Sequence, residues 1–237
     1  MIGCKCKVCQ SSDIRDKRMR ASVFLEVDDK NILIDCGPDF RAQMLFHDID
    51  QIDAILLTHK HIDHIGGIDD LRPLGNKKIY LDKQTEDAVK QMYGYCFAEN
   101  PYPGVPSLSL ERISYEPFKI CDGTIEVIPI RVMHGKMEIM GYRIGNFAYI
   151  TDVSSLSDDA EYEKLKGLEV VVLGCLRMTE HHSHQKFQEA MEMAKRINAK
   201  QTFFTHMCHH IGLHSEIEDL VPENIMFAYD GLSIAFE

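Results

Sequence analysis

The segment Thr58–Gly67, with the sequence THKHIDHIGG, places three histidines and one aspartate within six positions. In an extended segment, side chains two positions apart point to the same side, so His59, His61 and Asp63 can converge. His64 then joins them as the chain turns. Imidazole and carboxylate groups are ligands for zinc, manganese and iron, whereas a solvated loop has no need of histidines. The spacing therefore predicts a metal site, with enough ligands for two ions.

Four further residues follow strand-like apolar runs. His134 follows IRVM, Asp152 follows AYIT, His206 follows TFFT and Asp35 follows ILI. Taken singly, each has an ordinary explanation, since an aspartate after a strand is often a turn or helix-capping residue. Together they stand at strand ends, where binding and catalytic groups gather, and this favours a common site.

The HxHxDH motif, followed by these residues in this order, resembles the signature of the metallo-β-lactamase superfamily. The resemblance implies an α/β fold, an αββα four-layer sandwich of two mixed β-sheets with helices on the outer faces. It also implies a site with two divalent ions, zinc or manganese, with iron as a further option. By that resemblance His59, His61 and His134 hold one ion, Asp63, His64 and His206 hold the other, Asp152 bridges them, and Asp35 orients a ligand.

His184 narrows the resemblance to the branch that contains phosphoribosyl 1,2-cyclic phosphate phosphodiesterases and ribonuclease Z. It lies 22 positions before His206 (206 minus 184), near the place of a histidine that protonates the departing oxygen in that branch. The implied reaction is attack of a metal-bridging hydroxide on a phosphodiester, with His184 as general acid and Asp63 helping to orient the hydroxide. The alternative is a polar loop in which Ser183 caps a helix.

The N-terminal segment 1–10 contains Cys4, Cys6 and Cys9 in the pattern C-x-C-x2-C. Three thiolates need a fourth ligand to close a tetrahedral zinc site. The resemblance implies that His209 is this ligand of a structural zinc, with Cys208 and His210 as competitors. Relatives also carry a first strand and a Gly-rich turn before this trio, whereas this sequence starts almost at the trio. Either the start is internal or the strand is absent, so the completeness of one sheet edge stays open.

Composition restricts the partners. The chain has 237 residues, 45% of them hydrophobic, and a formal net charge of -11. It contains no linker-like or repetitive tract, so a single domain over 1–237 is predicted. The negative charge opposes binding to a long polyanion, which makes tRNA an unfavoured substrate and a small phosphodiester, cyclic or nucleotide-like, the favoured one.

No run is apolar and long enough to span a bilayer, so no membrane partner and a cytoplasmic location are predicted. A homodimer is suggested by analogy only.

Two other function classes stay open at this stage. One is a metallo-hydrolase of a non-phosphate substrate, such as a lactone or thioester, which has less need of an acid at His184. The other is a noncatalytic accessory protein of cofactor biosynthesis, which an incomplete ligand set would favour.

Apolar periodicity and turn residues predict the elements that position these groups. Two-strand patterns are expected over 21–37, 118–132, 140–152 and 224–237, the last turning at Asp230-Gly231. Buried strands are expected in 53–59, 77–82, 168–175 and 200–206. Helices are expected in 38–48, 85–95, 157–167 and 184–199, with a further one from Ile65 or Gly66.

Overall fold

The structure is a computed structural model that describes residues 1–236; the predicted end of the last strand pattern, Glu237, lies outside them. The chain divides into two compact units. The first unit comprises Arg20–Val127, and the second comprises Met1–Met19 together with Ile128–Glu237. Within residues 1–236, no helix is both long and apolar enough to cross a membrane.

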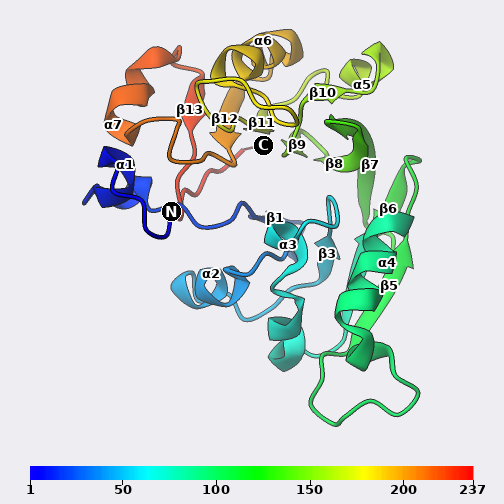
Figure 1. The fold of residues 1–237 in the computed structure, drawn as a ribbon. Coiled ribbons are helices and arrows are strands. Elements are labelled where there is room, and N and C mark those ends of the chain that lie inside the picture. The colour runs from blue at the N-terminus through cyan, green and yellow to red at the C-terminus, as the bar shows by residue number, and fades with distance from the viewer. Residues whose placement is uncertain (237) are drawn as a thin grey trace. The chain divides into compact units, whose positions relative to one another are not determined.

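The first unit contains a five-stranded mixed sheet with the order β1-β2-β3-β4-β5 (Figure 1). β1 and β2 are antiparallel, and the remaining neighbours are parallel. The strands are β1 (Val23–Val27), β2 (Lys30–Ile34), β3 (Ala54–Leu56), β4 (Lys77–Leu81) and β5 (Leu108–Arg112). All three residues of β3 are apolar and buried, as is typical of a central parallel strand.

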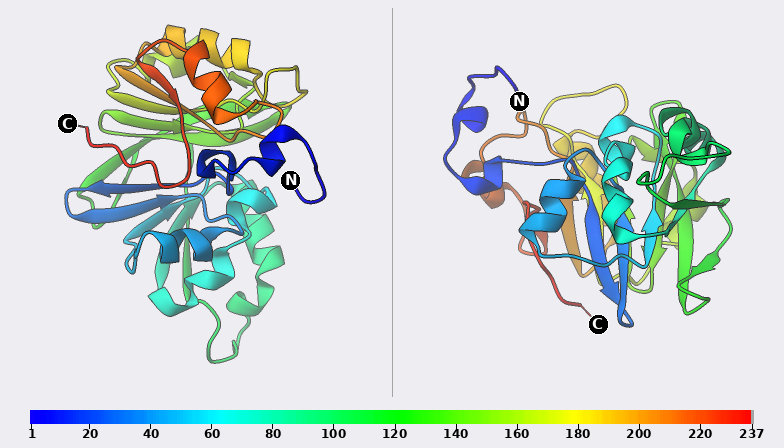
Figure 2. Two further views of the ribbon diagram at one scale, coloured as in Figure 1. Left: turned by 90° about the vertical axis from the view of Figure 1, so that its left-hand side faces the viewer. Right: turned by 90° about the horizontal axis from the view of Figure 1, so that it is seen from below.

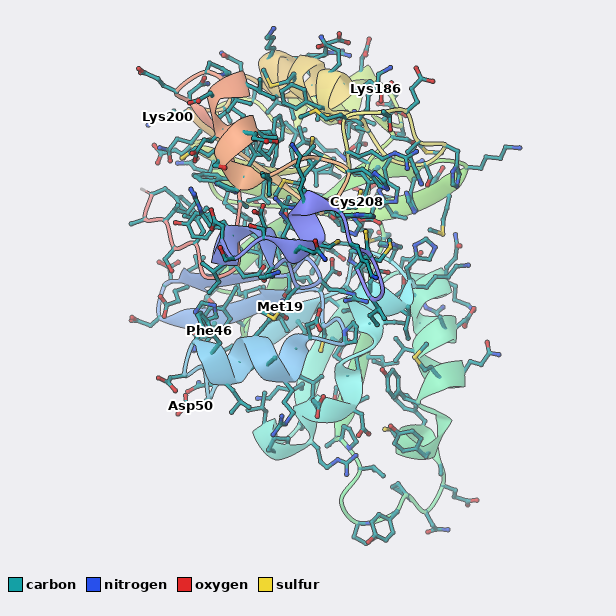
Figure 3. The ribbon with its side chains drawn as sticks, turned by 60° about the vertical axis from the view of Figure 1, so that its left-hand side comes forward. Met19, Phe46, Asp50, Lys186, Lys200 and Cys208 are labelled. Carbon is teal, nitrogen blue, oxygen red and sulfur yellow. The ribbon has the colours of Figure 1, made fainter. Side chains whose placement is uncertain are left out.

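Helices of the first unit connect the strands and pack on this sheet. They are α2 (Phe40–Phe46), α3 (Ile62–Ile65), α4 (Lys83–Met92) and the 3-10 segments η2 (Ile68–Leu74) and η3 (Gly94–Phe97). α4 begins where the Asp82 carboxylate accepts a hydrogen bond from the Thr85 amide at 2.9 Å. Figure 3 shows Phe46 at the end of α2 and Asp50 in the loop after it, both of which are exposed.

The second unit contains most of an eight-stranded mixed sheet with the order β10-β7-β8-β9-β11-β12-β13. Its strands are β7 (Ile125–His134), β8 (Met137–Ile144), β9 (Phe147–Ile150), β10 (Ser155–Leu156), β11 (Val170–Gly174), β12 (Gln201–Thr205) and β13 (Ile225–Phe227), and β6 (Phe118–Ile120) pairs with the start of β7. From β9 to β13 the neighbours are parallel, so the ends of β9, β11 and β12 lie at one edge.

Short helices and one long helix complete the second unit. They are α1 (Lys7–Gln10), η1 (Ile14–Asp16), α5 (Asp159–Glu163), α6 (Phe187–Ile197), α7 (His214–Ile217) and η4 (Glu218–Leu220). α6 lies across one face of the sheet (Figures 1 and 2) and buries Ala190, Met191, Ala194 and Ile197, as its apolar stripe predicts.

The predicted α/β class with two mixed sheets and helices is confirmed, but three local predictions differ from the structure. The predicted terminal hairpin is wrong: Ile225–Phe227 pairs in parallel with β12, and residues 230–236 form no strand. The Asp230 carboxylate instead accepts a hydrogen bond from the Met19 amide at 2.8 Å, so this residue joins two segments that lie far apart in the sequence. The helix expected from Ile65 begins at Ile62, and α6 begins at Phe187, after His184 rather than at it.

Candidate metal centre

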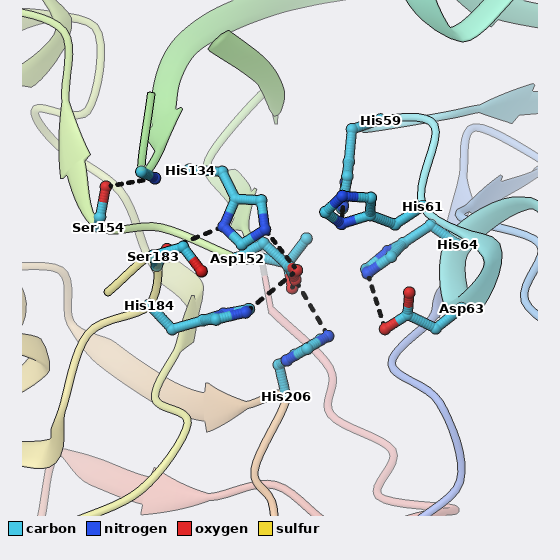
Figure 4. Close-up of polar contacts among 12 residues, drawn as sticks. His59, His61, Asp63, His64, His134, Asp152, Ser154, Ser183, His184 and His206 are labelled. Atoms are coloured by element: carbon cyan, nitrogen blue, oxygen red, sulfur yellow. Dashed lines mark hydrogen bonds and ion pairs between the residues drawn. The ribbon is translucent and has the colours of Figure 1, made fainter. Parts of the chain in front are cut away.

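The histidine motif of the first unit lies between the end of β3 and the short helix α3. His59 and His64 are buried, whereas His61 is exposed and Asp63 is partly exposed. The His59 Nε2 atom lies 2.9 Å from His61 Nδ1, and the His59 and His64 rings are 4.2 Å apart. His64 Nε2 lies 3.6 Å from an Asp63 carboxylate oxygen (Figure 4). All four ligand groups predicted from the motif are thus gathered in one place, Asp63 and His64 from a helical turn.

Asp35 fixes the orientation of this motif. Its fully buried carboxylate contacts the Nδ1 atom of His64 at 2.7 Å and accepts hydrogen bonds from the Thr58 amide and hydroxyl at 2.8 and 2.9 Å. A carboxylate on one ring nitrogen holds the imidazole so that the opposite nitrogen, Nε2, is presented as a ligand. These are the contacts that the predicted orienting role of Asp35 requires, and Thr58 is a partner that the sequence did not predict.

Two glycines allow the Asp35 turn to reach the motif. A Cβ atom at Gly37 would lie 2.2 Å from the backbone oxygen of Asp63, and one at Gly67 would lie 2.1 Å from that of Gly37. These distances are far below van der Waals contact, so a side chain at either position would force the backbone apart. Gly37 and Gly67 are thus required for the close packing that holds Asp35 against α3.

In the second unit, His134 is the last residue of β7 and is buried. Its Nδ1 atom lies 2.8 Å from the backbone carbonyl oxygen of Ser183, which can only accept a hydrogen bond. Nδ1 therefore carries the proton, and the lone pair of Nε2 is available to an ion. Gly135 allows the chain to turn here, because its φ is +63° and a Cβ atom at this position would lie 3.2 Å from the Ser183 Cβ atom.

Asp152 is the centre of the second unit's group, and three histidines point toward its carboxylate (Figure 4). His206 Nε2 lies 3.1 Å from Oδ1, while His134 Nε2 and His184 Nε2 each lie 3.9 Å from Oδ2. One ligand atom from each of Asp152, His184 and His206 falls within 4.8 Å of the others. The two carboxylate oxygens thus face different predicted ligands, as a bridging carboxylate requires.

His184 is partly buried, and its ring stacks on that of His206 with 5.3 Å between centroids. Burial lowers the pKa of this imidazole to about 3, and the nearby Asp152 carboxylate only partly opposes the effect. The ring therefore needs an additional negative charge beside it before it holds a proton at neutral pH.

Asp35, Asp152 and His206 share an unusual backbone conformation. Their φ angles are 65°, 52° and 59°, in the left-handed region that residues other than glycine seldom adopt. Each stands at or just after a strand end, where the chain must turn sharply. Such conformations persist where the surrounding structure holds them, and they concentrate at functional sites.

The three N-terminal thiols meet His209 within the second unit. One ligand atom from each of Cys4, Cys6, Cys9 and His209 lies within 4.8 Å of the others, and His209 Nδ1 is 3.5 Å from Cys4 Sγ and 3.3 Å from Cys6 Sγ. The donor set and its spacing fit a closed Cys3His zinc site. Among the described residues neither competitor, Cys208 or His210, belongs to this group.

The Cys6 thiol is prepared for metal binding. The backbone amide of Cys9 and then the His209 ring lower its pKa to about 6. Since the thiolate is the form that binds zinc, Cys6 is ready as a ligand at neutral pH.

Comparison with known proteins agrees with this arrangement. The family model described as a beta-lactamase superfamily domain matches residues 30–207, a range that includes parts of both units. A solved structure described as a new diphosphatase from the PhnP family is 39% identical, with a TM-score of 0.91, and the match covers 100% of this chain and 92% of that one.

Two curated relatives match the chain over about half of their own length. An octanoyltransferase of Porphyromonas gingivalis is 41% identical over 98% of this chain and 48% of its own length. The exodeoxyribonuclease YycJ of Bacillus anthracis is 29% identical over 57% of this chain and 51% of its own length. The chain thus spans about half the length of these relatives.

Proposed function

We propose, since the chain belongs to the beta-lactamase superfamily and to the PhnP family within it, that it is a metal-dependent phosphodiesterase acting on a small phosphodiester. Membership of this superfamily gives the chain the metallo-β-lactamase fold of a hydrolase family. The contact that supports the finer proposal is that of His184 Nε2 with Asp152 Oδ2, at 3.9 Å. It puts an imidazole that can take up and give a proton beside the carboxylate that we assign to both ions.

We assign the ligands as the superfamily pattern implies. His59, His61 and His134 would hold one ion, Asp63, His64 and His206 the other, and Asp152 both. Zinc and manganese are the first candidates, with iron next, and a structural zinc would occupy Cys4, Cys6, Cys9 and His209. When bound, two divalent ions supply Lewis acidity toward phosphoryl oxygens and bring the pKa of water toward neutrality.

The residues of the chain supply orientation and a proton. Asp35 and the Ser183 carbonyl hold His64 and His134 with Nε2 turned to the site. A bound phosphodiester adds a negative charge beside His184, which favours the protonated imidazole. His184 would then give its Nε2 proton to the departing oxygen, while Asp63 helps to orient the attacking water.

Two observations support a small substrate. The net charge of -11 disfavours a long polyanion such as tRNA. The similar solved protein is described as a diphosphatase, whereas the similar exodeoxyribonuclease shares only 57% of this chain. A cyclic or nucleotide-like phosphodiester is therefore the substrate class that we propose. A zinc site of thiolates is stable in a reducing compartment, which supports a cytoplasmic location.

The decisive experiment compares His184→Ala with two phosphodiesters in the metal-loaded protein. Hydrolysis of a ribose cyclic phosphodiester, whose leaving group is an alkoxide, should slow by about 10²- to 10⁴-fold because a general acid is lost. Hydrolysis of bis-p-nitrophenyl phosphate should also slow, but less, because p-nitrophenolate departs more readily without a proton. The exposed neighbour His182→Ala is the matched control, and metal content should stay unchanged. If His184→Ala hydrolysed each of the two substrates as fast as the parent protein does, the proton-donor role of His184 would be refuted.

The octanoyltransferase relative favours one second candidate, hydrolysis of an acyl thioester. The named activity belongs to a protein about twice as long, of which this chain matches 48%. Assay of the metal-loaded chain with an octanoyl thioester and a cyclic phosphodiester separates the two functions. Thioester cleavage that is indifferent to His184→Ala, without phosphodiester cleavage, would replace the first proposal by the second.

A further inference from the structure

Thr151 connects β9 to Asp152 and is 1% exposed. Its hydroxyl donates a hydrogen bond of 2.8 Å to Oδ1 of Asp152. The same oxygen lies 3.1 Å from His206 Nε2, while Oδ2 lies on the side of His134 and His184. The Thr151 hydroxyl thus contacts the carboxylate oxygen that faces His206, and not the one that faces His134 and His184.

The backbone next to this hydrogen bond is tightly packed. A Cβ atom at Gly174, the last residue of β11, would lie 3.0 Å from the Asp152 amide nitrogen and 3.4 Å from the Thr151 carbonyl carbon. The left-handed φ of 52° at Asp152 also fixes the direction in which its side chain leaves the chain. The remaining freedom of the carboxylate is rotation about its own side-chain bonds, and this is what a hydrogen bond to Oδ1 restricts.

We propose that Thr151 is a positioning residue for the carboxylate that bridges the two ions. Its hydroxyl holds the Asp152 carboxylate in one rotamer, with Oδ1 toward His206 and Oδ2 toward His134, the orientation in which the carboxylate would serve both ions. Because the carboxylate is oriented before the ions arrive, less side-chain freedom is lost on binding. This inference depends on the proposed two-ion site, and it assigns to Thr151 the control of metal affinity.

Two pairs of variants isolate the hydroxyl group. Thr151→Val keeps the shape of the parent side chain without the hydroxyl, and Thr151→Ser differs from Thr151→Ala by the hydroxyl alone. The control is Thr202→Val on β12, since Thr202 is also 1% exposed but lies at the opposite end of that strand from His206. The readouts are titration calorimetry of Mn²⁺ into metal-stripped protein and the melting temperature of the metal-free form.

Thr151→Val and Thr151→Ala should bind Mn²⁺ about 10- to 100-fold more weakly than the parent protein, as is usual when a group that orients a metal ligand is removed. Thr151→Ser should restore most of the affinity, and Thr202→Val should bind as the parent does. The melting temperatures of the metal-free variants should not rank in the same order as their Mn²⁺ affinities. A hydroxyl with a structural role alone would change the melting temperature without a selective change in Mn²⁺ affinity.

Thr151→Val binding as tightly as the parent protein, or Thr151→Ser binding as weakly as Thr151→Ala, would overturn the inference. Should Thr151→Val fail to fold, the Ser and Ala pair decides the same question. A parent protein that binds no second Mn²⁺ would instead refute the proposed two-ion site, so the two failures are distinguishable.

Discussion

The Nδ1 atom of His209 lies 3.3 Å from the Sγ atom of Cys6, although 203 positions separate the two residues. His209 follows the proposed ligand His206 by three positions, in a short turn that leaves β12. The N-terminal segment is held to the same unit by further contacts, among them that of the Asp16 carboxylate with the His214 amide at 2.9 Å. Zinc at the thiol cluster would thus restrain the turn that carries His206.

Removal of this zinc should loosen that turn. His209→Ala should purify with about one zinc fewer per chain and melt at a lower temperature, because four ligands close the site and three do not. Metal analysis and differential scanning calorimetry measure both effects. The neighbour His210→Ala is the control, being exposed and outside the ligand group. Full zinc content in His209→Ala would exclude His209 as the fourth ligand.

Asp35→Asn should weaken metal binding without removing a ligand. The carboxylate contacts His64 and accepts from Thr58, and an amide cannot reproduce these contacts because its nitrogen is a donor only. We expect a loss of metal affinity of about 10- to 100-fold, measured by calorimetric titration. Asp50→Asn, at an exposed position of the same unit, should have no effect. Unchanged affinity in Asp35→Asn would mean that His64 is oriented by other groups.

Gly37→Ala should destabilise the protein, because the new Cβ would meet the Asp63 backbone oxygen at 2.2 Å. Forced backbone shifts of this kind typically cost about 1–3 kcal/mol. Urea unfolding followed by circular dichroism gives the change in unfolding free energy. Gly94→Ala is a matched control, since a Cβ there meets nothing within 4 Å. Equal stability of the two variants would show that the Asp35 turn can move away from α3.

Glu86 should make stability depend on acid pH. Hydrogen bonds from Arg112 and then Lys90 lower the pKa of this carboxyl from 4.5 to about 2. A lowered folded-state pKa means that the stabilisation is complete above about 4.5 and is lost as the pH falls toward 2. Glu86→Gln should therefore melt below the parent protein at pH 7, and the difference should shrink by pH 3. A difference that stays constant between these pH values would contradict the ion-pair explanation.

The sequence was sufficient to predict the groups that stand at strand ends. The motif at His59–His64 follows the parallel strand β3, and Asp152 and His206 follow β9 and β12, whose parallel course with β11 brings their ends to one edge of that sheet. His134 instead ends β7, whose neighbours are antiparallel. The sequence also predicts the antiparallel pairs β1–β2, β6–β7 and β8–β9. Their turns contain glycine, asparagine or aspartate, which tolerate the backbone dihedral angles that tight turns require.

Contacts made through the backbone could not be predicted in this way. The Ser183 carbonyl that orients His134 belongs to a loop 49 positions away, and nothing in its residue type indicates the pairing. Thr58 and Thr151 precede His59 and Asp152 directly, yet a threonine near a strand end is common, so only geometry shows their hydroxyls on carboxylates. The terminal hairpin was wrong because Asp230 is used by Met19 in a distant segment.

The second unit is discontinuous along the chain, since Met1–Met19 belongs with residues that begin at Ile128. During synthesis on the ribosome, the three cysteines are made before their histidine, and His209 follows Cys6 by 203 positions. At about 5–20 residues per second this interval lasts roughly 10–40 s. For that time the thiols lack the histidine that completes the Cys4, Cys6, Cys9 and His209 group, so zinc bound there would close its four-ligand site only late in translation.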